Sequence, residues 1–326
     1  MRIVTIEEHV SFPEMTQFIP EGLLTKKEPS GPAVQMMSKL ADISGERLDS
    51  MNQTGISMQV LSVENMDVNL LDNTSAPEFA SKYNDLLADK IKDHPDRFTA
   101  FAHLPMVNPS AAADELERTV KTYGFRGAMI RGLTKGKFLD VPEFAPIFER
   151  AEKLGVPIYI HPGIPPQPVI DAYYSNIGNT TSSFDALACW GWGWHSETAI
   201  HVLRLLVAGV FDTYPKLKII IGHMGEMLPM MWDRSNKAFQ PGNGGKNQRT
   251  MIETFQQQLY MTTSGIFTQP PLQIALDTIG IDNIILSVDY PFSTNQMGIE
   301  FLNGIQLPAD QIAKIAHENA DRLLGL

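Results

Sequence analysis

The sequence predicts an α/β fold: a single (β/α)8 TIM-type barrel that spans residues 1–326 and carries long loops after its first and fifth strands. Three observations indicate this fold. Eight short, mostly apolar runs recur along the chain, segments of helical periodicity lie between them, and polar residues end several runs. Short apolar strands are typical of parallel sheets that are buried on both faces. Their repeated alternation with helices is typical of a (β/α)8 barrel.

The eight expected strands are all short. They lie at Arg2–Ile6, Ser57–Ser62, Phe98–Leu104, Gly127–Arg131, Pro157–Ile160, Lys218–Gly222, Leu259–Thr262 and Asn283–Val288. Two of the intervening helices are marked by their ends. A helix over Pro142–Leu154 is expected to stop at Gly155, and another over 196–209 is expected to begin near Ser196 or Glu197.

Two connections are too long for simple strand-to-helix turns. Residues 10–50 follow the first strand, and residues 162–195 follow the fifth. Because both leave the carboxyl end of a strand, both are expected to lie over the mouth of the active site. The second connection is rich in aromatic residues. They are equally suited to form a wall against a planar substrate and to fill an oligomer interface. Its aromatic residues are Tyr173, Tyr174, Phe184, Trp190, Trp192 and Trp194.

The composition excludes several classes of function. The net charge is −11 and no Lys/Arg-rich run is present, so nucleic acid is not an expected partner. Cys189 is the only cysteine, which excludes an intrachain disulfide and a cysteine-based zinc cluster. No stretch approaches the roughly 18 apolar residues that span a bilayer. The first strand begins almost at Met1, which leaves no room for a signal peptide, so a cytoplasmic location is expected.

Five polar side chains that follow predicted strands define a candidate site. They are Glu7, His9, His161, His223 and Asp289. In a closed barrel of parallel strands, residues at the strand carboxyl ends converge even when they are far apart in sequence. Imidazoles and carboxylates are the ligand set of a borderline divalent metal. A single histidine at a strand end is more often a hydrogen-bonded structural residue, but the five positions together predict an enzyme with one metal ion.

The remaining histidines receive different assignments. His94 in a turn and His317 in a terminal helix are expected to be solvated. His201 lies in an amphipathic segment and is expected to be a hydrogen-bonded core residue. His103 and His195 receive no role.

The motifs around the strand ends carry a family resemblance. They are Ile6-Glu-Glu-His9, Tyr159-Ile-His-Pro162, Ile221-Gly-His-Met-Gly-Glu226, Met261-Thr-Thr-Ser-Gly265 and Ser287-Val-Asp-Tyr-Pro-Phe292. The chain resembles the amidohydrolase-2 branch of the amidohydrolase superfamily from end to end. Within that branch it is similar to the non-oxidative decarboxylases, in particular those of γ-resorcylate (2,6-dihydroxybenzoate) and 2,3-dihydroxybenzoate.

The resemblance implies one divalent metal held by four ligands. These are Glu7, His9, His161 and Asp289. Their imidazole content favours Mn²⁺ or Zn²⁺ over Mg²⁺. Hydrolases of the superfamily commonly open with His-x-His, whereas a glutamate takes the first position here, as it does in these decarboxylases. Binuclear hydrolases bridge two metals through a carboxylated lysine after the fourth strand, where this chain has Arg131, so one metal is expected.

The implied reaction is the metal-dependent, non-oxidative decarboxylation of an ortho-hydroxy aromatic carboxylic acid of the dihydroxybenzoate or salicylate type. Protonation of the carboxyl-bearing ring carbon precedes loss of CO2, with Asp289 as the favoured acid and His223 and Glu226 as its partners. The other interpretation is that His223 and Glu226 only hold Asp289 in position and take no part in proton transfer. The alternative function is a metal-dependent hydrolase of a lactone or amide. A non-catalytic binding barrel is a third.

Four residues are candidate substrate contacts. Arg131 is expected either to pair with an anionic ring substituent or to form a structural ion pair. Arg234 is expected to contact the substrate or its surroundings, or to form a surface pair with Asp233. Phe292 and Trp194 are candidates for packing against the ring. The expected partner is a small aromatic carboxylate, and the resemblance implies a homodimer or homotetramer, with which the aromatic loops agree.

Overall fold

The computed structural model describes residues 1–19, 31–64, 71–175 and 186–326. Within these ranges lie eight parallel strands, which form a three-stranded sheet in the order β1-β2-β3 and a five-stranded sheet in the order β4-β5-β6-β7-β8. Each expected strand is present near its predicted position. The strands are β1 (Val4–Val10), β2 (Met58–Val63), β3 (Phe98–Ala100), β4 (Ala128–Arg131), β5 (Ile158–His161), β6 (Ile219–Ile221), β7 (Leu259–Thr262) and β8 (Ile284–Ile285).

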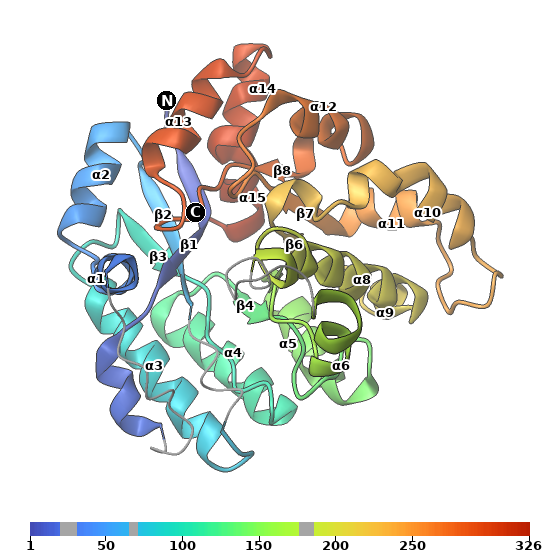
Figure 1. The fold of residues 1–326 in the computed structure, drawn as a ribbon, viewed down its shortest axis with the longest axis horizontal. Coiled ribbons are helices and arrows are strands. Elements are labelled where there is room, and N and C mark those ends of the chain that lie inside the picture. The colour runs from blue at the N-terminus through green and yellow to red at the C-terminus, as the bar shows by residue number, and fades with distance from the viewer. Residues whose placement is uncertain (20–30, 65–70, 176–185) are drawn as a thin grey trace.

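The strands are buried on both faces. Along β6, Ile219 and Ile221 belong to the core that packs against the helices, whereas Ile220 belongs to a second cluster on the opposite face of the sheets. Successive side chains of a strand point to opposite faces, so an all-apolar strand needs a core on each side. Figure 1 shows the strands at the centre of the molecule with helices around them.

Hydrogen bonds also run between the edges of the two sheets. Past the end of β3, the Ala102 N–H donates to the carbonyl of Gly127 at 2.8 Å, next to β4. Past the end of β8, the Ser287 hydroxyl oxygen accepts the N–H groups of Ile6 and Glu7 on β1, each at 2.8 Å. The three-stranded sheet is therefore in contact with the five-stranded sheet at both of its edges.

Helices follow the strands along the chain. α5 ends at Gly155, which has the predicted left-handed conformation (φ 69°). α8 begins at Gly193, earlier than the predicted start at Ser196 or Glu197, because residues 193–195 already take helical conformation. The longer helices are α1 (Pro32–Ala41), α2 (Glu46–Thr54), α3 (Ser75–Ile91), α4 (Pro109–Tyr123), α5 (Ala145–Leu154), α8 (Gly193–Val207), α10 (Trp232–Ala238), α11 (Met251–Gln258), α12 (Gln269–Thr278) and α13 (Asn295–Gly304). Shorter helices include α9 (Val210–Thr213), α14 (Ala309–Ala313) and α15 (Asn319–Leu324).

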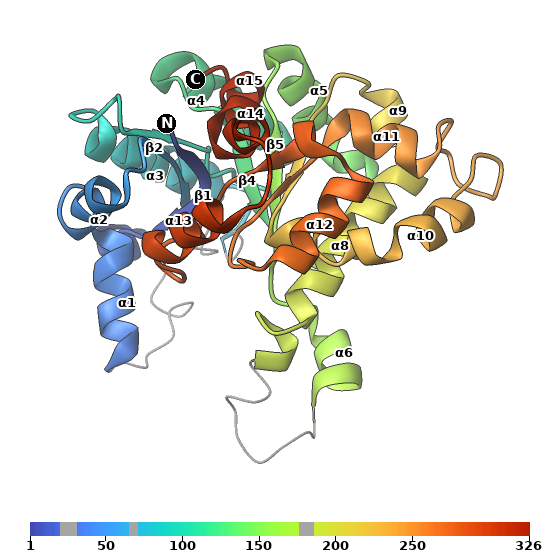
Figure 2. The ribbon, with the colours of Figure 1, turned by 90° about the horizontal axis from the view of Figure 1, so that it is seen from above.

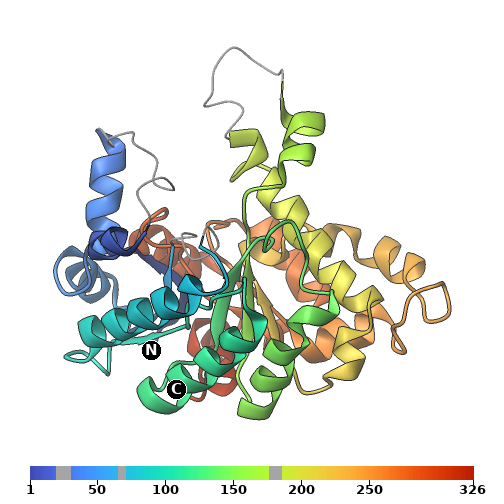
Figure 3. The same cartoon turned by 90° about the horizontal axis from the view of Figure 1, so that it is seen from below.

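Both long connections contain helical segments. The first carries α1 and the start of α2, and the second carries α6 (Gln167–Val169) followed by a π-helical turn over Ile170–Tyr174. The apolar residues of α1 and its proline start explain the helix, since Pro suits the first helical turn. α1 and α6 project from the same side of the molecule (Figures 2 and 3). Phe184 lies outside the described residues.

Among the helices of the described ranges, none has both the length and the apolar character needed to cross a membrane.

Candidate active site

Four of the predicted site residues converge at the ends of β1, β5 and β8. One ligand atom from each of Glu7, His9, His161 and Asp289 lies within 4.8 Å of the others. His9 Nε2 is 3.0 Å from Asp289 Oδ1, and His161 Nε2 is 3.3 Å from Glu7 Oε1. The structure therefore brings together side chains from the two ends of the chain, as the strand-end pattern predicted.

Glu8, between the two site residues of β1, points to the other face of the strand and fixes the turn after β8. Its carboxyl oxygens accept the backbone N–H groups of Val288 and Tyr290, each at 3.0 Å. These two groups flank Asp289, whose φ of 70° lies in the left-handed region that non-glycine residues rarely adopt. Burial raises the pKa of Glu8 to about 8. Glu8 thus stabilises the strained turn that presents Asp289 to the site.

Three hydroxyl groups surround Glu7. Tyr159 and Ser264 donate hydrogen bonds to Glu7 Oε2, and Thr262 donates to the same oxygen at 3.0 Å. Burial on its own would raise the pKa of Glu7, but the imidazoles around it, His223 foremost, hold that pKa well below its ordinary value. The hydroxyl groups orient a charged carboxylate whose other oxygen is left for the site.

The cluster fits a divalent metal ion. Glu7 Oε1 and His9 Nε2 are buried atoms that lie near His161 Nε2 and Asp289 Oδ1 but form no hydrogen bond of acceptable geometry among the described residues. Buried polar atoms without a hydrogen bond are uncommon in folded proteins, and a bound ion would explain them. The two imidazoles and two carboxylates of Glu7, His9, His161 and Asp289 are a donor set typical of Mn²⁺ or Zn²⁺. These residues can therefore hold one metal.

A second cluster lies beside the first and consists of His195, His223 and Glu226. His195 is the member for which the sequence predicted no role. Glu226 is fully buried, and its Oε1 lies 2.8 Å from His223 Nδ1, as the spacing of the two residues predicted. Its Oε2 lies 2.6 Å from His195 Nδ1. Burial would lower the pKa of His223, but the carboxylates of Glu226 and Glu7 raise it well above its ordinary value. His223 Nε2 is 3.9 Å from Asp289 Oδ2, so the two clusters adjoin.

His195 has a hydrogen-bond acceptor beside each of its ring nitrogens. Nδ1 faces the Glu226 carboxylate and Nε2 faces the backbone carbonyl of Trp190 at 2.8 Å. Both groups only accept hydrogen bonds, so this arrangement favours the doubly protonated, charged ring. Burial would lower the pKa of His195, but the carboxylate of Glu226 raises it overall. No local motif marks this residue, since its partner Glu226 lies 31 positions further along the chain.

Arg131, the last residue of β4, forms a buried ion pair. Its Nη2 is 2.7 Å from Glu64 Oε2, and its Nε donates to the carbonyl of Val63 at 3.1 Å. Nη1 and Nη2 also lie 2.8 Å from the Nδ1 atoms of His161 and His9. Of the two predictions for Arg131, the structure therefore favours the ion pair over a free cation that awaits an anionic substituent.

Two glycines allow β4 and β5 to come together directly after Arg131 and His161. A Cβ atom on Gly132 would lie 2.7 Å from the Gly163 Cα, and one on Gly163 would lie 2.5 Å from the Gly132 Cα. Real Cβ atoms essentially never approach so closely, and Gly132 also has a φ of +52°. Only glycine at both positions keeps the ends of these two strands at their observed separation.

A cavity of about 460 Å³ opens onto both clusters. Trp194 and Phe292, the predicted ring-packing residues, line it, and the Phe292 ring lies 5.8 Å from the His9 ring, centroid to centroid. The cavity is largely apolar with a few convergent polar groups, which is typical of a small-molecule site. Its lining consists of Glu64, His161, Trp190, Trp194, His195, His223, Gly265, Ile266, Asp289, Phe292 and Ser293.

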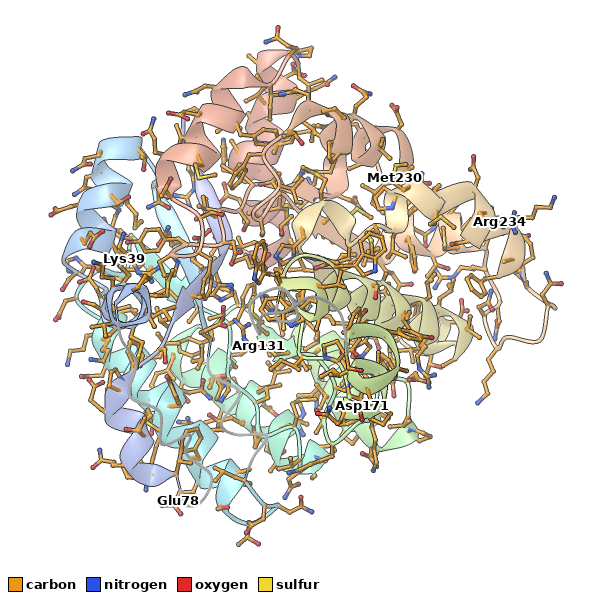
Figure 4. All side chains as sticks on the ribbon, viewed as in Figure 1. Lys39, Glu78, Arg131, Asp171, Met230 and Arg234 are labelled. Atoms are coloured by element: carbon orange, nitrogen blue, oxygen red, sulfur yellow. The ribbon has the colours of Figure 1, made fainter. Side chains whose placement is uncertain are left out.

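Arg234, predicted either to contact the substrate or its surroundings or to form a surface pair with Asp233, is not among the residues that line this cavity. It is exposed on α10, as is its neighbour Asp233. Figure 4 shows Arg131 near the centre of the molecule and Arg234 close to its edge. The motif around Arg234 gave no information on where α10 packs, and this helix lies at the periphery.

Two other histidines lie outside the cavity lining of the described residues. His201 is buried and its Nε2 accepts the Leu139 N–H at 2.9 Å, which confirms the prediction of a hydrogen-bonded core residue. His103 is also buried, and burial lowers its pKa to about 3.

The chain is similar to known proteins along most of its length. A model of the amidohydrolase family matches residues 36–326. The gamma-resorcylate decarboxylase of Rhizobium sp. is 36% identical over 340 residues, which cover 99% of this chain and 98% of that protein. The decarboxylase orsB of Emericella nidulans is 36% identical over 296 residues, which cover 89% and 87%.

A solved structure resembles the whole chain. The dihydroxybenzoic acid decarboxylase of Polaromonas sp. JS666, crystallised with manganese and the inhibitor 2-nitroresorcinol, has a TM-score of 0.87 at 32% identity. The similarity covers 100% of this chain and 97% of that one. A family model matches most of the length of this chain and the relatives cover nearly all of it, so the chain belongs to the amidohydrolase family.

Proposed function

We propose that this protein is a carboxy-lyase that catalyses the metal-dependent, non-oxidative decarboxylation of an ortho-hydroxy aromatic carboxylic acid. The observation that carries this proposal is the convergence of a four-residue metal-ligand set and the His223–Glu226 pair on one aromatic-lined cavity. The relatives act on compounds of this kind by their names, gamma-resorcylate and dihydroxybenzoic acid. They favour decarboxylation over hydrolysis of a lactone or amide.

The proposal includes the architecture around the site. The chain forms one domain, in which the two sheets close into a single (β/α)8 barrel with the site at the carboxyl ends of its strands. The bonds from Ala102 to Gly127 and from Ile6 to Ser287 support closure, because they join the sheets at both edges. Assembly into a homodimer or homotetramer is part of the same proposal, and the exposed Trp190 and Trp192 support it.

One divalent ion would be held by Glu7, His9, His161 and Asp289. When bound, it supplies positive charge that favours the phenolate form of the substrate. Mn²⁺ and Zn²⁺ both suit these donors, and manganese in the Polaromonas relative supports Mn²⁺.

Asp289 and His223 would supply the proton. An aryl–CO2 bond does not break to leave a ring carbanion, so the carboxyl-bearing carbon is protonated first and the C–C electron pair then restores the aromatic ring as CO2 leaves. Each turnover consumes one proton. The raised pKa of His223 keeps a proton available 3.9 Å from Asp289, and Glu226 accepts the other N–H of the same ring. Trp194 and Phe292 would hold the ring in the plane that this transfer needs.

The test is CO2 release from 2,6-dihydroxybenzoate, 2,3-dihydroxybenzoate, salicylate and 5-carboxyvanillate, with metal content determined on the same sample. We expect CO2 from at least one acid, its loss after chelation, and its return with Mn²⁺ or Zn²⁺. A fully metallated protein that releases no CO2 from any of them contradicts the proposal, and lactones would then be assayed for hydrolysis.

A further inference from the structure

The guanidinium of Arg131 already has an anionic partner, which decides what the cavity presents to a ligand. Glu64 Oε2 lies 2.7 Å from Arg131 Nη2, and Arg131 is only 7% exposed. An arginine that is buried in an ion pair does not offer its charge to a second anion without leaving the first carboxylate unpaired. The cation is therefore satisfied within the protein.

Glu64 is the exposed member of this pair. Its side chain is 28% exposed and lines the cavity, whereas its Oε2 is buried against Arg131. Among the described residues, the contacts of the Glu64 carboxylate with Arg131 and His9 both involve Oε2 and none involves Oε1. A carboxylate oxygen only accepts hydrogen bonds. The exposed part of the pair is thus an acceptor.

The position of Glu64 is fixed on three sides. Its backbone N–H donates to the carbonyl of Val10 at 2.8 Å, which holds it at the end of β2 beside β1. Arg131 binds both the Glu64 carboxylate and the carbonyl of the preceding residue, Val63. Oε2 also lies 3.6 Å from His9 Nδ1, so the carboxylate adjoins the metal-ligand cluster. A fixed acceptor of this kind selects ligands more sharply than a mobile side chain does.

We propose that Glu64, held by Arg131, determines substrate specificity by accepting a hydrogen bond from a second hydroxyl group on the aromatic ring. This inference rests on the proposed decarboxylation. The substrate class is then a dihydroxybenzoate rather than a monohydroxybenzoate, which has no second donor for Glu64. An aromatic dicarboxylate is disfavoured more strongly, because its second carboxylate would face a like charge.

Loss of the Glu64 carboxylate should change the preference in a defined direction. In Glu64→Ala, Arg131 loses its partner and becomes an unpaired cation at the cavity wall. The variant should lose preference for a dihydroxybenzoate over salicylate by roughly 10- to 100-fold in kcat/KM. It should gain on 5-carboxyvanillate relative to the dihydroxy acids, because the freed guanidinium can pair with the additional carboxylate.

The control variant removes a matched pair elsewhere. Asp140 binds Arg204 through both oxygens, at 2.9 and 2.8 Å, and does not line the cavity. Asp140→Ala should leave all substrate ratios unchanged. Metal content is measured for each protein, and ratios between substrates are compared within one preparation, so that a general loss of metal or fold does not alter the readout.

A binding measurement separates this inference from the proposed function. Calorimetric titration with resorcinol and with phenol needs no chemistry, and the wild type should bind resorcinol more tightly, with the difference lost in Glu64→Ala. If the ratio of resorcinol affinity to phenol affinity is the same in the wild type and in Glu64→Ala, the role of Glu64 is overturned, even if CO2 is released. Absence of CO2 from every acid, with the resorcinol preference intact, overturns the decarboxylase proposal and leaves Glu64 as an acceptor for a hydroxylated aromatic ligand.

Discussion

Glu226 Oε2 lies 2.6 Å from His195 Nδ1, so a fully buried carboxylate contacts an imidazole at the wall of the cavity and favours its charged form. Its other oxygen is bound to His223. Two imidazoles thus share one negative charge, and each restrains the protonation of the other. His195, which lies outside the four-ligand cluster, therefore affects the pKa of His223, a proposed proton donor.

His195→Ala should lower kcat by between about 10- and 100-fold while metal content stays at the wild-type level. Removal of one positive neighbour leaves Glu226 to His223 alone, which raises the pKa of His223 further. The alkaline limb of the kcat profile should therefore move to higher pH. His195→Gln, which keeps an N–H donor toward Glu226, should recover part of kcat without restoring the profile. An unchanged pH profile in His195→Ala would show that the residue only fills space.

Asp289→Asn should reduce CO2 release by about 10²- to 10⁴-fold with the fold intact, because the amide cannot transfer the proton. Its circular dichroism spectrum should match that of the wild type. Ser293→Ala, at another position of the cavity lining, is the control and should keep most of the activity. Retention of activity by Asp289→Asn would contradict the assignment of the acid.

Tyr159→Phe should weaken metal affinity by about 10- to 100-fold, since it removes a hydroxyl that orients Glu7. Competition with a chelating dye measures this affinity directly and does not depend on turnover. Tyr260 lies in the same interior cluster, and Tyr260→Phe removes a hydroxyl without touching Glu7 among the described residues. If both variants bound the metal equally well, the hydroxyl shell around Glu7 would have no part in holding it.

Glu197 makes stability depend on pH. Burial raises the pKa of Glu197 from 4.5 to about 8, and its Oε1 has no hydrogen-bond partner among the described residues. Between these pH values the folded protein keeps a proton that the unfolded chain releases, so the free energy of unfolding falls as pH rises, by at most about 1.4 kcal/mol per pH unit for this group. Glu197→Gln should remove this contribution. Urea denaturation at pH 5 and pH 8 should therefore show that the free energy of unfolding of the variant, relative to that of the wild type, is higher at pH 8 than at pH 5. An equal difference at both pH values would exclude the group as the source.

The strand ends could be predicted from the sequence because burial on both faces leaves a clear pattern. Several strands are apolar runs, and the first polar side chain after or within the end of such a run is conspicuous, as His161 and Asp289 are. Topology then brings these positions together without any need to know the side-chain packing. The long connections were harder to predict, because their helices pack through few apolar residues, as in α1.

Partners across the site could not be predicted in the same way. Glu64 and Arg131, and likewise His195 and Glu226, meet only through the packing of side chains from distant parts of the chain. Tyr159 has the appearance of an ordinary apolar strand residue in the sequence, although its hydroxyl binds Glu7. The sequence around Arg234 likewise carries no sign that α10 lies at the edge of the molecule.

The contact between Gly132 and Gly163 has a consequence for laboratory evolution. A side chain at either position would separate Arg131 from His161 and displace both the pair that is proposed to select the substrate and a ligand of the proposed metal. A mutagenesis screen scored on turnover would therefore rank these two glycines beside the metal ligands, although neither has a side chain that could take part in chemistry. Mutant libraries aimed at new substrates should leave both glycines unchanged and vary aromatic and apolar residues of the cavity lining, such as Trp190 and Ile266, instead.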